Sequence, residues 1–326
     1  MTRLVVEALT YTSREEWLEL RRKDITASEA GVLFGEHKYS SLRKLALEKA
    51  YGENRPQTAA MRRGKVMEPS VAEAVTIDHG WQLRRSNDYL RARSPTDPYL
   101  RIGATRDYVI PALPRELMLR ALRDQALALG WDAHETAHLA LECKSVEPFV
   151  FESEWGEHPP KYILVQAAIQ AALSGALGTV VACLLENRTR DLFLYAVPRS
   201  AAFEAELFAR VSDFWRRYEA GEEFAVSAFD NAEMSTTYPK ADTDDVVDLT
   251  DEAATWAPLA EERARLKKDL DARKKRVDEI EARFKDRLRG AYKAILPGWS
   301  VTWKKDSGGV RRFKCDKDSA ANRRRR

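Results

Sequence analysis

The sequence predicts an α/β (α+β) fold in which a mixed central sheet is flanked by helices, followed by a long C-terminal helix and a β-hairpin appendage. The first 220 residues alternate between helical periodicity and short β-branched or aromatic runs bounded by turn residues. Residues 259–295 keep apolar side chains at helical spacing among many Lys and Arg, and residues 299–315 contain two alternating runs around a turn. The 326 residues, 44% of them hydrophobic, suffice for about two domains.

Helices are expected first over 13–22, 41–52 and 59–77, with a further start at Thr26 or Ser28. Ser13 followed by Glu16 has the spacing of a capping box. In the third of these helices Pro69 favours a bend or a new start, which places Glu68 beside a break.

Strands of one sheet are expected within 81–93, 99–110 and 138–146, because these runs are rich in β-branched and aromatic residues. An inserted helix is expected within 112–136, ending on Gly130. Next come a strongly apolar helix over 162–176, two strands within 179–198 joined at 186–190, and a last core helix over 201–221.

The C-terminal third divides by charge. Residues 230–256 hold 8 acidic and 1 basic residue, residues 257–296 hold 13 basic and 8 acidic ones, and residues 297–326 hold 10 basic and 3 acidic ones. We therefore expect a domain over 1–229, an acidic linker over 230–254 and a basic long helix, hairpin and tail over 255–326. The apolar stripe of the helix is predicted to run from Leu259 to Ile295.

Several classes of protein are excluded. No apolar run approaches the roughly 20 residues that a bilayer span needs, and the N-terminus lacks the features of a secretory signal. Cys143, Cys183 and Cys315 lie far apart without metal-binding spacing. We therefore expect a cytoplasmic protein without a disulfide framework, a zinc site or a membrane span.

The most informative constellation is Asp107 on one predicted strand and Glu142-Cys143-Lys144 on another. Residues i and i+2 of a strand point to the same face, so Glu142 and Lys144 lie side by side. Two carboxylates beside an ammonium form a hard-oxygen site for Mg²⁺, an arrangement suited to phosphodiester hydrolysis. The alternative is a solvated strand face, which the apolar residues around the motif disfavour.

The order of Glu68, Asp107, Glu142-x-Lys144 and Gln166 resembles the PD-(D/E)xK nucleases. LRRKDITASE at 20–29 and GKVME at 64–68 are more closely similar to the branch of YqaJ viral recombinases and lambda exonuclease. The resemblance covers about residues 14–220 and implies a restriction-endonuclease-like fold. Arg106 and Tyr108 flank Asp107 where this branch usually has proline and glycine.

The resemblance also implies roles for particular residues. Direct metal ligands would be Asp107, Glu142 and the backbone carbonyl of Cys143, with Glu68 completing the site directly or through water. Lys144 would act at the nucleophilic water, and Gln166 would orient the lysine or the water. Arg21, Ser28 and Thr105 would bind the 5′-phosphate of a DNA end.

By resemblance, the chain is expected to be a Mg²⁺-dependent DNA exonuclease, with Mn²⁺ as a substitute, that resects duplex ends 5′ to 3′ to expose single strands in a bacterial cell or phage-infected host. The expected partner is DNA; a single-strand annealing protein and a homo-oligomer are further partners that stay open. Alternatives are a repair or restriction-type endonuclease on the same core and a non-catalytic DNA-binding or coiled-coil module. Trp299, Trp303 and Phe313, interleaved with Lys and Arg, fit base stacking and ordinary hairpin packing equally.

Overall fold

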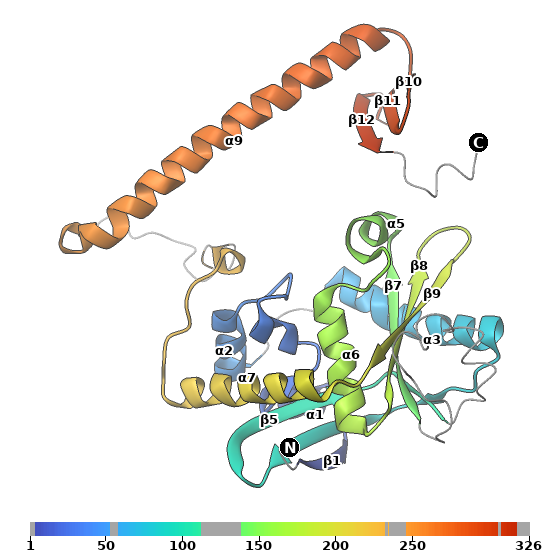
Figure 1. The fold of residues 1–326 in the computed structure, drawn as a ribbon, viewed down its shortest axis with the longest axis vertical. Coiled ribbons are helices and arrows are strands. Elements are labelled where there is room, and N and C mark those ends of the chain that lie inside the picture. The colour runs from blue at the N-terminus through green and yellow to red at the C-terminus, as the bar shows by residue number, and fades with distance from the viewer. Residues whose placement is uncertain are drawn as a thin grey trace. The chain divides into compact units, whose positions relative to one another are not determined.

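The computed structural model describes residues 4–52, 58–111, 138–231, 234, 246–305 and 308–317. The chain forms two compact units, Met1–Pro239 and Lys240–Arg326, whose elements are labelled in Figure 1. The helix expected within 112–136 and most of the linker expected over 230–254 lie outside the described residues. Within the described ranges, no helix combines the length and apolar character required to cross a membrane.

A five-stranded mixed sheet, in the order β3-β6-β7-β8-β9, forms one half of the first unit. Its strands are β3 (Arg84–Arg85), β6 (Tyr108–Ile110), β7 (Leu139–Val146), β8 (Gly178–Leu185) and β9 (Leu192–Pro198). Only β7 and β8 pair in parallel, while the other neighbours are antiparallel. All eight residues of β8 are buried, so this strand has both faces covered.

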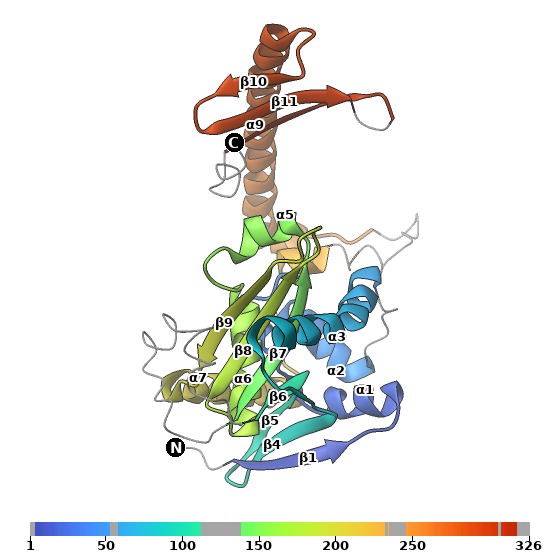
Figure 2. The ribbon, with the colours of Figure 1, turned by 90° about the vertical axis from the view of Figure 1, so that its right-hand side faces the viewer.

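The helices on the two faces of this sheet are α3 (Ala59–His79) and α6 (Lys161–Ser174). Val180 and Ala182 of β8 belong to the core cluster that includes Val71 of α3, whereas Val181 and Cys183 pack with residues of α6. The alternation follows from the two-residue period of a strand. Figure 2 shows α3 lying across β7 and β8.

A second, four-stranded sheet in the order β1-β4-β5-β2 packs on the other side of α6. Its strands are β1 (Val5–Thr10), β4 (Asp88–Ser94), β5 (Asp97–Thr105) and β2 (Ile25–Thr26), and helix α7 (Ala201–Glu219) covers β5. Because α6 lies between both sheets, it is buried on several sides and shows almost no polar face.

This arrangement corrects the prediction that residues 81–93, 99–110 and 138–146 are strands of one sheet. The chain bends at Arg106 and Asp107, which separates β5 from β6, and only β6 continues into the sheet of β7. The strand β1 was not predicted. It is largely exposed on both faces, so its sequence lacks the alternation that marks a half-buried strand.

The helices predicted over 13–22, 41–52, 59–77, 162–176 and 201–221 are present with small shifts of their ends. The further helices of the first unit are α1 (Arg14–Arg22), α2 (Leu42–Tyr51), α5 (Pro148–Val150), the 3₁₀ turns η1 (Ala30–Phe34) and η3 (Ala228–Asp230), and the π turn η2 (Phe151–Trp155). Ser13, Ser41 and Thr58 cap their helices through side-chain oxygens. Of the two alternatives at Pro69, a new start is excluded, because α3 runs on through this residue. One expectation was wrong: β2 and η1 replace a helix starting at Thr26 or Ser28.

The second unit contains the 3₁₀ turn η4 (Thr250–Glu252), the helix α9 (Ala253–Leu288) and a sheet of β10 (Lys293–Leu296), β11 (Trp299–Lys305) and β12 (Arg311–Lys317). The predicted hairpin thus has a third strand. The helical stripe ends at Leu288, not at Ile295, because Arg289 adopts a left-handed φ of 46° that ends the helix. Phe284 packs on Phe313, with ring centroids 5.8 Å apart.

Candidate active site

The register of β6 and β7 brings Asp107 beside the Glu142-Cys143-Lys144 segment. Tyr108 pairs with Leu141, so the preceding residue, Asp107, lies opposite Glu142. The Cys143 amide donates to Asp107 Oδ2 at 2.8 Å, and the Asp107 carbonyl accepts from the Ser86 amide at 3.1 Å. These two bonds hold the carboxylate at the bend without a proline or glycine neighbour.

Glu142 is the centre of the polar network, since its residue is only 3% exposed. Lys144 Nζ donates to its Oε1 at 2.5 Å, and Gln166 Nε2 donates to the same oxygen at 2.6 Å. Lys144 Nζ also lies 3.3 Å from Gln166 Oε1. The structure therefore brings together three of the residues predicted for catalysis, at hydrogen-bonding distances.

Gln170 is a member of this network that the sequence analysis missed. Its Nε2 donates to Glu142 Oε2 at 2.5 Å and to the Thr105 carbonyl at 2.8 Å, and the residue is fully buried. Within the described part of the chain its Oε1 has no hydrogen-bond partner, although buried polar atoms are usually satisfied. The available signal was its place four residues after Gln166, on the same side of α6.

Glu68 lies on α3, the helix that covers the face of the five-stranded sheet opposite α6. Its Oε1 is 3.6 Å from Arg85 Nη2, and the residue is partly buried. Burial raises the pKa of Glu68; Arg85 lowers it and Glu142 raises it, and the net shift is upward. Glu68 therefore belongs to the electrostatic environment of the site, but no direct bond joins it to Asp107 or Glu142 among the contacts of the described residues.

The site crowds negative charge. Burial raises the pKa of Asp107 well above its ordinary value, and the neighbouring Glu142 and Glu68 raise it further. Burial lowers the pKa of Lys144, but Glu142 and Asp107 outweigh that effect and the net pKa is raised. Lys144 is consequently a cation at neutral pH, in contact with Glu142 and close to Asp107.

The donor chemistry of the site fits a hard divalent cation. Carboxylate oxygens are the ligands that Mg²⁺ prefers, and a cation would relieve the repulsion that raises the pKa of Asp107. Across the described ranges, no three His, Cys, Asp or Glu side chains converge closely enough to hold an ion by themselves. Mg²⁺ commonly takes only one or two protein carboxylates and keeps several waters, so a pair of carboxylates such as Asp107 and Glu142 is compatible with such an ion.

Of the predicted phosphate-binding residues, Arg21 lies in the last turn of α1, Ser28 follows β2, and Thr105 ends β5. An Arg21 Nη atom donates to Ser28 Oγ at 3.1 Å, and the Arg21 guanidinium stacks on Trp17 at 4.4 Å. Thr105 lies two residues after Gly103, and Gly103 of β5 pairs with Thr26 of β2. Arg21 and Ser28 are thus in direct contact, while Thr105 contacts Gln170 through its carbonyl.

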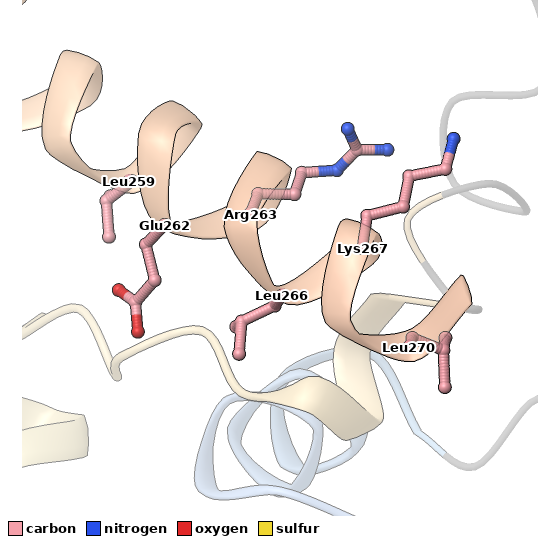
Figure 3. Close-up of a pocket in the computed structure, with 6 residues that line it drawn as sticks. All are labelled: Leu259, Glu262, Arg263, Leu266, Lys267 and Leu270. Atoms are coloured by element: carbon pink, nitrogen blue, oxygen red, sulfur yellow. The ribbon is translucent and has the colours of Figure 1, made fainter. Parts of the chain in front are cut away.

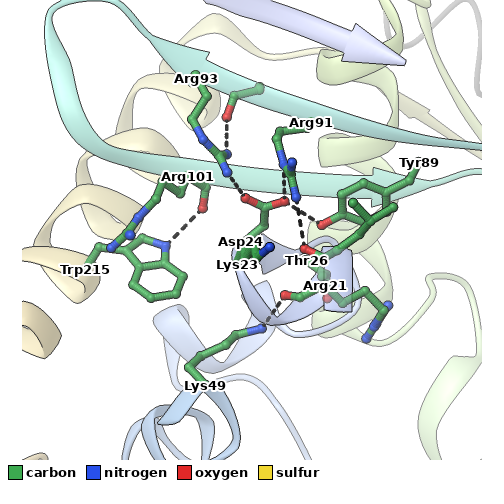
Figure 4. A network of polar contacts seen from close by, with 12 residues as sticks. Arg21, Lys23, Asp24, Thr26, Lys49, Tyr89, Arg91, Arg93, Arg101 and Trp215 are labelled. Carbon is green, nitrogen blue, oxygen red and sulfur yellow. Dashed lines mark hydrogen bonds and ion pairs between the residues drawn. The ribbon is translucent and has the colours of Figure 1, made fainter. Parts of the chain in front are cut away.

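The segment that carries Arg21 and Ser28 is anchored by the fully buried Asp24 (Figure 4). Asp24 accepts from the Tyr89 hydroxyl and from Arg91 Nε, both at 2.9 Å, and it also pairs with Arg93. These partners lie on β4, so the turn after α1 is fixed to the four-stranded sheet by charge-assisted bonds.

Comparisons with known proteins identify the class to which this fold and site belong. The profile of the YqaJ-like viral recombinase domain matches residues 16–177. That range includes every residue of the site described above. Residues 16–177 are thus similar to the YqaJ-like viral recombinase domain, which confirms the resemblance seen in the sequence and supports a phage-type nuclease.

Solved structures similar to this chain include an alkaline exonuclease, LHK-Exo, from Laribacter hongkongensis. It is 18% identical, with a TM-score of 0.46, and the match covers 69% of this chain and 100% of that chain. A phage-related exonuclease from Haemophilus somnus 129PT is 13% identical, with a TM-score of 0.41 and coverage of 60% and 94%. No curated protein sequence matches the chain.

Proposed function

We propose that the chain is a Mg²⁺-dependent DNA exonuclease that degrades one strand from duplex ends, 5′ to 3′, and leaves a single strand for a separate annealing protein. The observation that carries the proposal is the contact of Lys144 with Glu142, beside Asp107, within the family segment. A cation adjacent to crowded carboxylates is the arrangement that phosphodiester hydrolysis requires.

Asp107, Glu142 and the Cys143 backbone carbonyl would hold the Mg²⁺, with Glu68 joining directly or through water and Mn²⁺ as a substitute. When bound, the ion supplies a more acidic water and neutralises charge on the scissile phosphate. Lys144 places an ammonium where negative charge develops on the phosphate. Gln166 contacts both Lys144 and Glu142, so it orients the lysine.

Arg21 and Ser28 support recognition of a phosphorylated 5′ end. A guanidinium and a hydroxyl 3.1 Å apart offer donors to a single phosphate, and guanidinium groups bind phosphates strongly. Arg21 Nε is buried and has no hydrogen-bond partner among the residues that the structure describes. A guanidinium N–H that can donate to a ligand oxygen favours binding over a purely structural role.

The metal site is tested by digestion of end-labelled linear and circular duplexes, with Mg²⁺ or with EDTA. The wild type is expected to digest linear duplex only, and only with Mg²⁺. Asp107→Ala and Glu142→Ala should abolish cleavage, and Lys144→Ala should abolish it while retaining Mg²⁺ binding. Glu206→Ala, which removes an exposed carboxylate on α7, is the control and should cleave at the wild-type rate.

The outcomes separate the alternatives. Cleavage of circular duplex by the wild type would favour a repair or restriction-type endonuclease. Binding without cleavage under every condition would favour a non-catalytic DNA-binding module. Wild-type rates for Asp107→Ala and Glu142→Ala would show that the site assignment is wrong.

End recognition is tested with linear duplexes that carry 5′-phosphate or 5′-hydroxyl ends. The phosphorylated duplex should be degraded faster, and Arg21→Ala should remove the difference. Arg14→Ala, on the exposed side of the same helix, should preserve it. Equal wild-type rates on both duplexes would contradict a 5′-phosphate site.

A further inference from the structure

The helix α9 exposes an apolar stripe along one face. Its members are each between 41% and 57% exposed; they are Trp256, Leu259, Leu266, Leu270, Val277 and Ile280. Figure 3 shows Leu259, Leu266 and Leu270 projecting to one side of the helix, while Arg263 and Lys267 project elsewhere. Within the second unit, β12 covers only the end of the helix, where Phe313 meets Phe284.

The stripe has the spacing of a coiled coil. Coiled coils repeat every seven residues, at positions labelled a to g, with apolar residues at a and d. If Trp256 is position a, then Leu270, Val277 and Phe284 are also a positions. The d positions are then Leu259, Leu266 and Ile280. Arg263 at a and Arg273 at d are the interruptions before Phe284, and their long side chains can carry the charge out of an apolar seam.

The residues that flank this seam are charge-complementary to a second copy of the same helix. In a parallel two-stranded coiled coil, each g residue faces the e residue five positions later on the other strand. The facing residues are Glu262 with Lys267, Asp269 with Lys274 and Arg276 with Glu281. Each of the three pairs joins opposite charges, and the symmetry of a dimer forms each pair twice.

We propose that α9 associates with the α9 of a second copy of this chain as a parallel coiled coil over about residues 256–281. The charge pattern favours this occupant, because the antiparallel register that matches the same apolar layers brings Lys267 against Lys274. At about 1.5 Å per residue, this seam is about 38 Å long. The inference does not depend on the proposed nuclease function, since none of its residues belongs to the site of the first unit.

The first test measures the mass of the full-length protein in solution by sedimentation equilibrium. The wild type should sediment as at least twice the 37.1 kDa chain, and Leu266→Asp/Leu270→Asp should halve that mass. Ala264→Asp/Ala272→Asp introduces the same residues on the outer face at b and c positions and should leave the mass unchanged. A monomeric wild type, or one mass for all three proteins, would overturn the proposal. A monomer is also the result expected if the first unit of the same chain covers the stripe.

The second test reads the orientation through charge reversal. Glu262→Lys should weaken self-association about tenfold, because two attractive pairs become repulsive. Adding Lys267→Glu should restore the affinity, and adding Arg276→Glu instead should not, because it also places two acidic residues, 276 and 281, against each other in the parallel pair. Restoration by Arg276→Glu would identify an antiparallel pair, in which residues 262 and 276 face each other. An unchanged affinity for Glu262→Lys would show that these charges do not face a second helix; either result overturns the parallel arrangement.

Discussion

Asp107 is the residue at which the requirements of folding and of the proposed chemistry oppose one another. Its carboxyl is held at the bend by the Cys143 amide, while burial, Glu142 and Glu68 all disfavour its ionised form. Without a cation, ionisation of this group therefore destabilises the folded protein. Sites that concentrate like charges in this way are typical of functional centres.

Asp107→Asn should stabilise the metal-free protein as the pH rises. The pKa of Asp107 is higher in the folded state than its ordinary 3.8, so the folded protein binds this proton more tightly. Its stabilising effect is complete below 3.8 and is lost as the pH rises through the folded pKa. In EDTA, the variant should match the wild-type Tm at pH 3.5 and exceed it at pH 8.

Asp78→Asn removes an exposed carboxylate near the end of α3 and serves as the control. It should follow the wild-type Tm across the same pH range. If Asp107→Asn melts below the wild type at pH 8 in EDTA, the carboxylate is stabilised in the folded state and the account of the crowded site is wrong.

Gln170 is expected to act as a positioning residue for Glu142. Gln170→Ala removes the donor to Glu142 Oε2 and to the Thr105 carbonyl. The Mg²⁺ concentration for half-maximal cleavage should rise about 10- to 100-fold, because residues that orient a metal ligand affect metal affinity to this extent. Ser174→Ala, whose hydroxyl bonds only backbone carbonyls of α6, should leave that concentration unchanged. A fall in maximal rate without a change in Mg²⁺ dependence would indicate a purely structural role.

The strands β4 and β5 hold the turn after α1 through a close approach at Gly103. A Cβ at this position would lie 2.0 Å from the Tyr89 hydroxyl oxygen and 2.4 Å from its Cζ. Tyr89 is fully buried and donates to Asp24. Glycine at 103 therefore allows the phenol to reach across β5 and complete the bonds of Asp24.

Gly103→Ala should destabilise the fold by about 1–3 kcal/mol, since a buried ring must shift and loses its bond to Asp24. Gly64→Ala places a methyl group in open space on α3 and should instead stabilise by about 0.5–1 kcal/mol. Urea denaturation of both variants measures the difference. Equal free energies of unfolding for Gly103→Ala and the wild type would show that Tyr89 is not confined by β5.

Local signals in the sequence predict most helices, whereas pairing between distant segments is not encoded locally. Ser13 and Ser41 mark the starts of α1 and α2 as expected. The division of the strands between two sheets depends on the bend at Asp107, which no proline or glycine announces. Asp24 follows three basic residues in the sequence, yet the partners that bury it, Arg91 and Arg93, come more than sixty residues later.

The part of the candidate site that lies on β7 was predictable, because its residues are close together in the sequence. Glu142 and Lys144 share a face by strand geometry alone, and the family motif supplies Glu68, Asp107 and Gln166. Gln170 was missed because one polar residue in an apolar helix gives no indication of its partner. Only the placement of α6 against both β7 and β5 identifies its two acceptors, Glu142 and the Thr105 carbonyl.

The distribution of charge divides the molecule into two functional parts. The Lys and Arg in excess lie beyond residue 256, in the unit of α9 and the C-terminal sheet. There, Arg311 stacks on Trp303 at 3.5 Å and donates to the carbonyls of Arg289 and Ala291, and Phe313 packs on Phe284. These aromatic rings serve internal packing, so we expect the unit to contact DNA through phosphate neutralisation.

Truncation after Asp251 should therefore weaken duplex DNA binding and flatten its salt dependence while leaving the site around Glu142 in place. Each phosphate contact that is lost reduces the slope of log K against log salt concentration by about 0.9. Fluorescence anisotropy with a labelled duplex at several salt concentrations, in EDTA to prevent cleavage, measures both quantities. Leu266→Asp/Leu270→Asp in the full chain is the matched control, because it disrupts the apolar stripe but keeps all the basic residues. If truncation and this variant reduce the slope equally, the basic unit acts through assembly; if truncation changes neither affinity nor slope, the unit does not contact DNA.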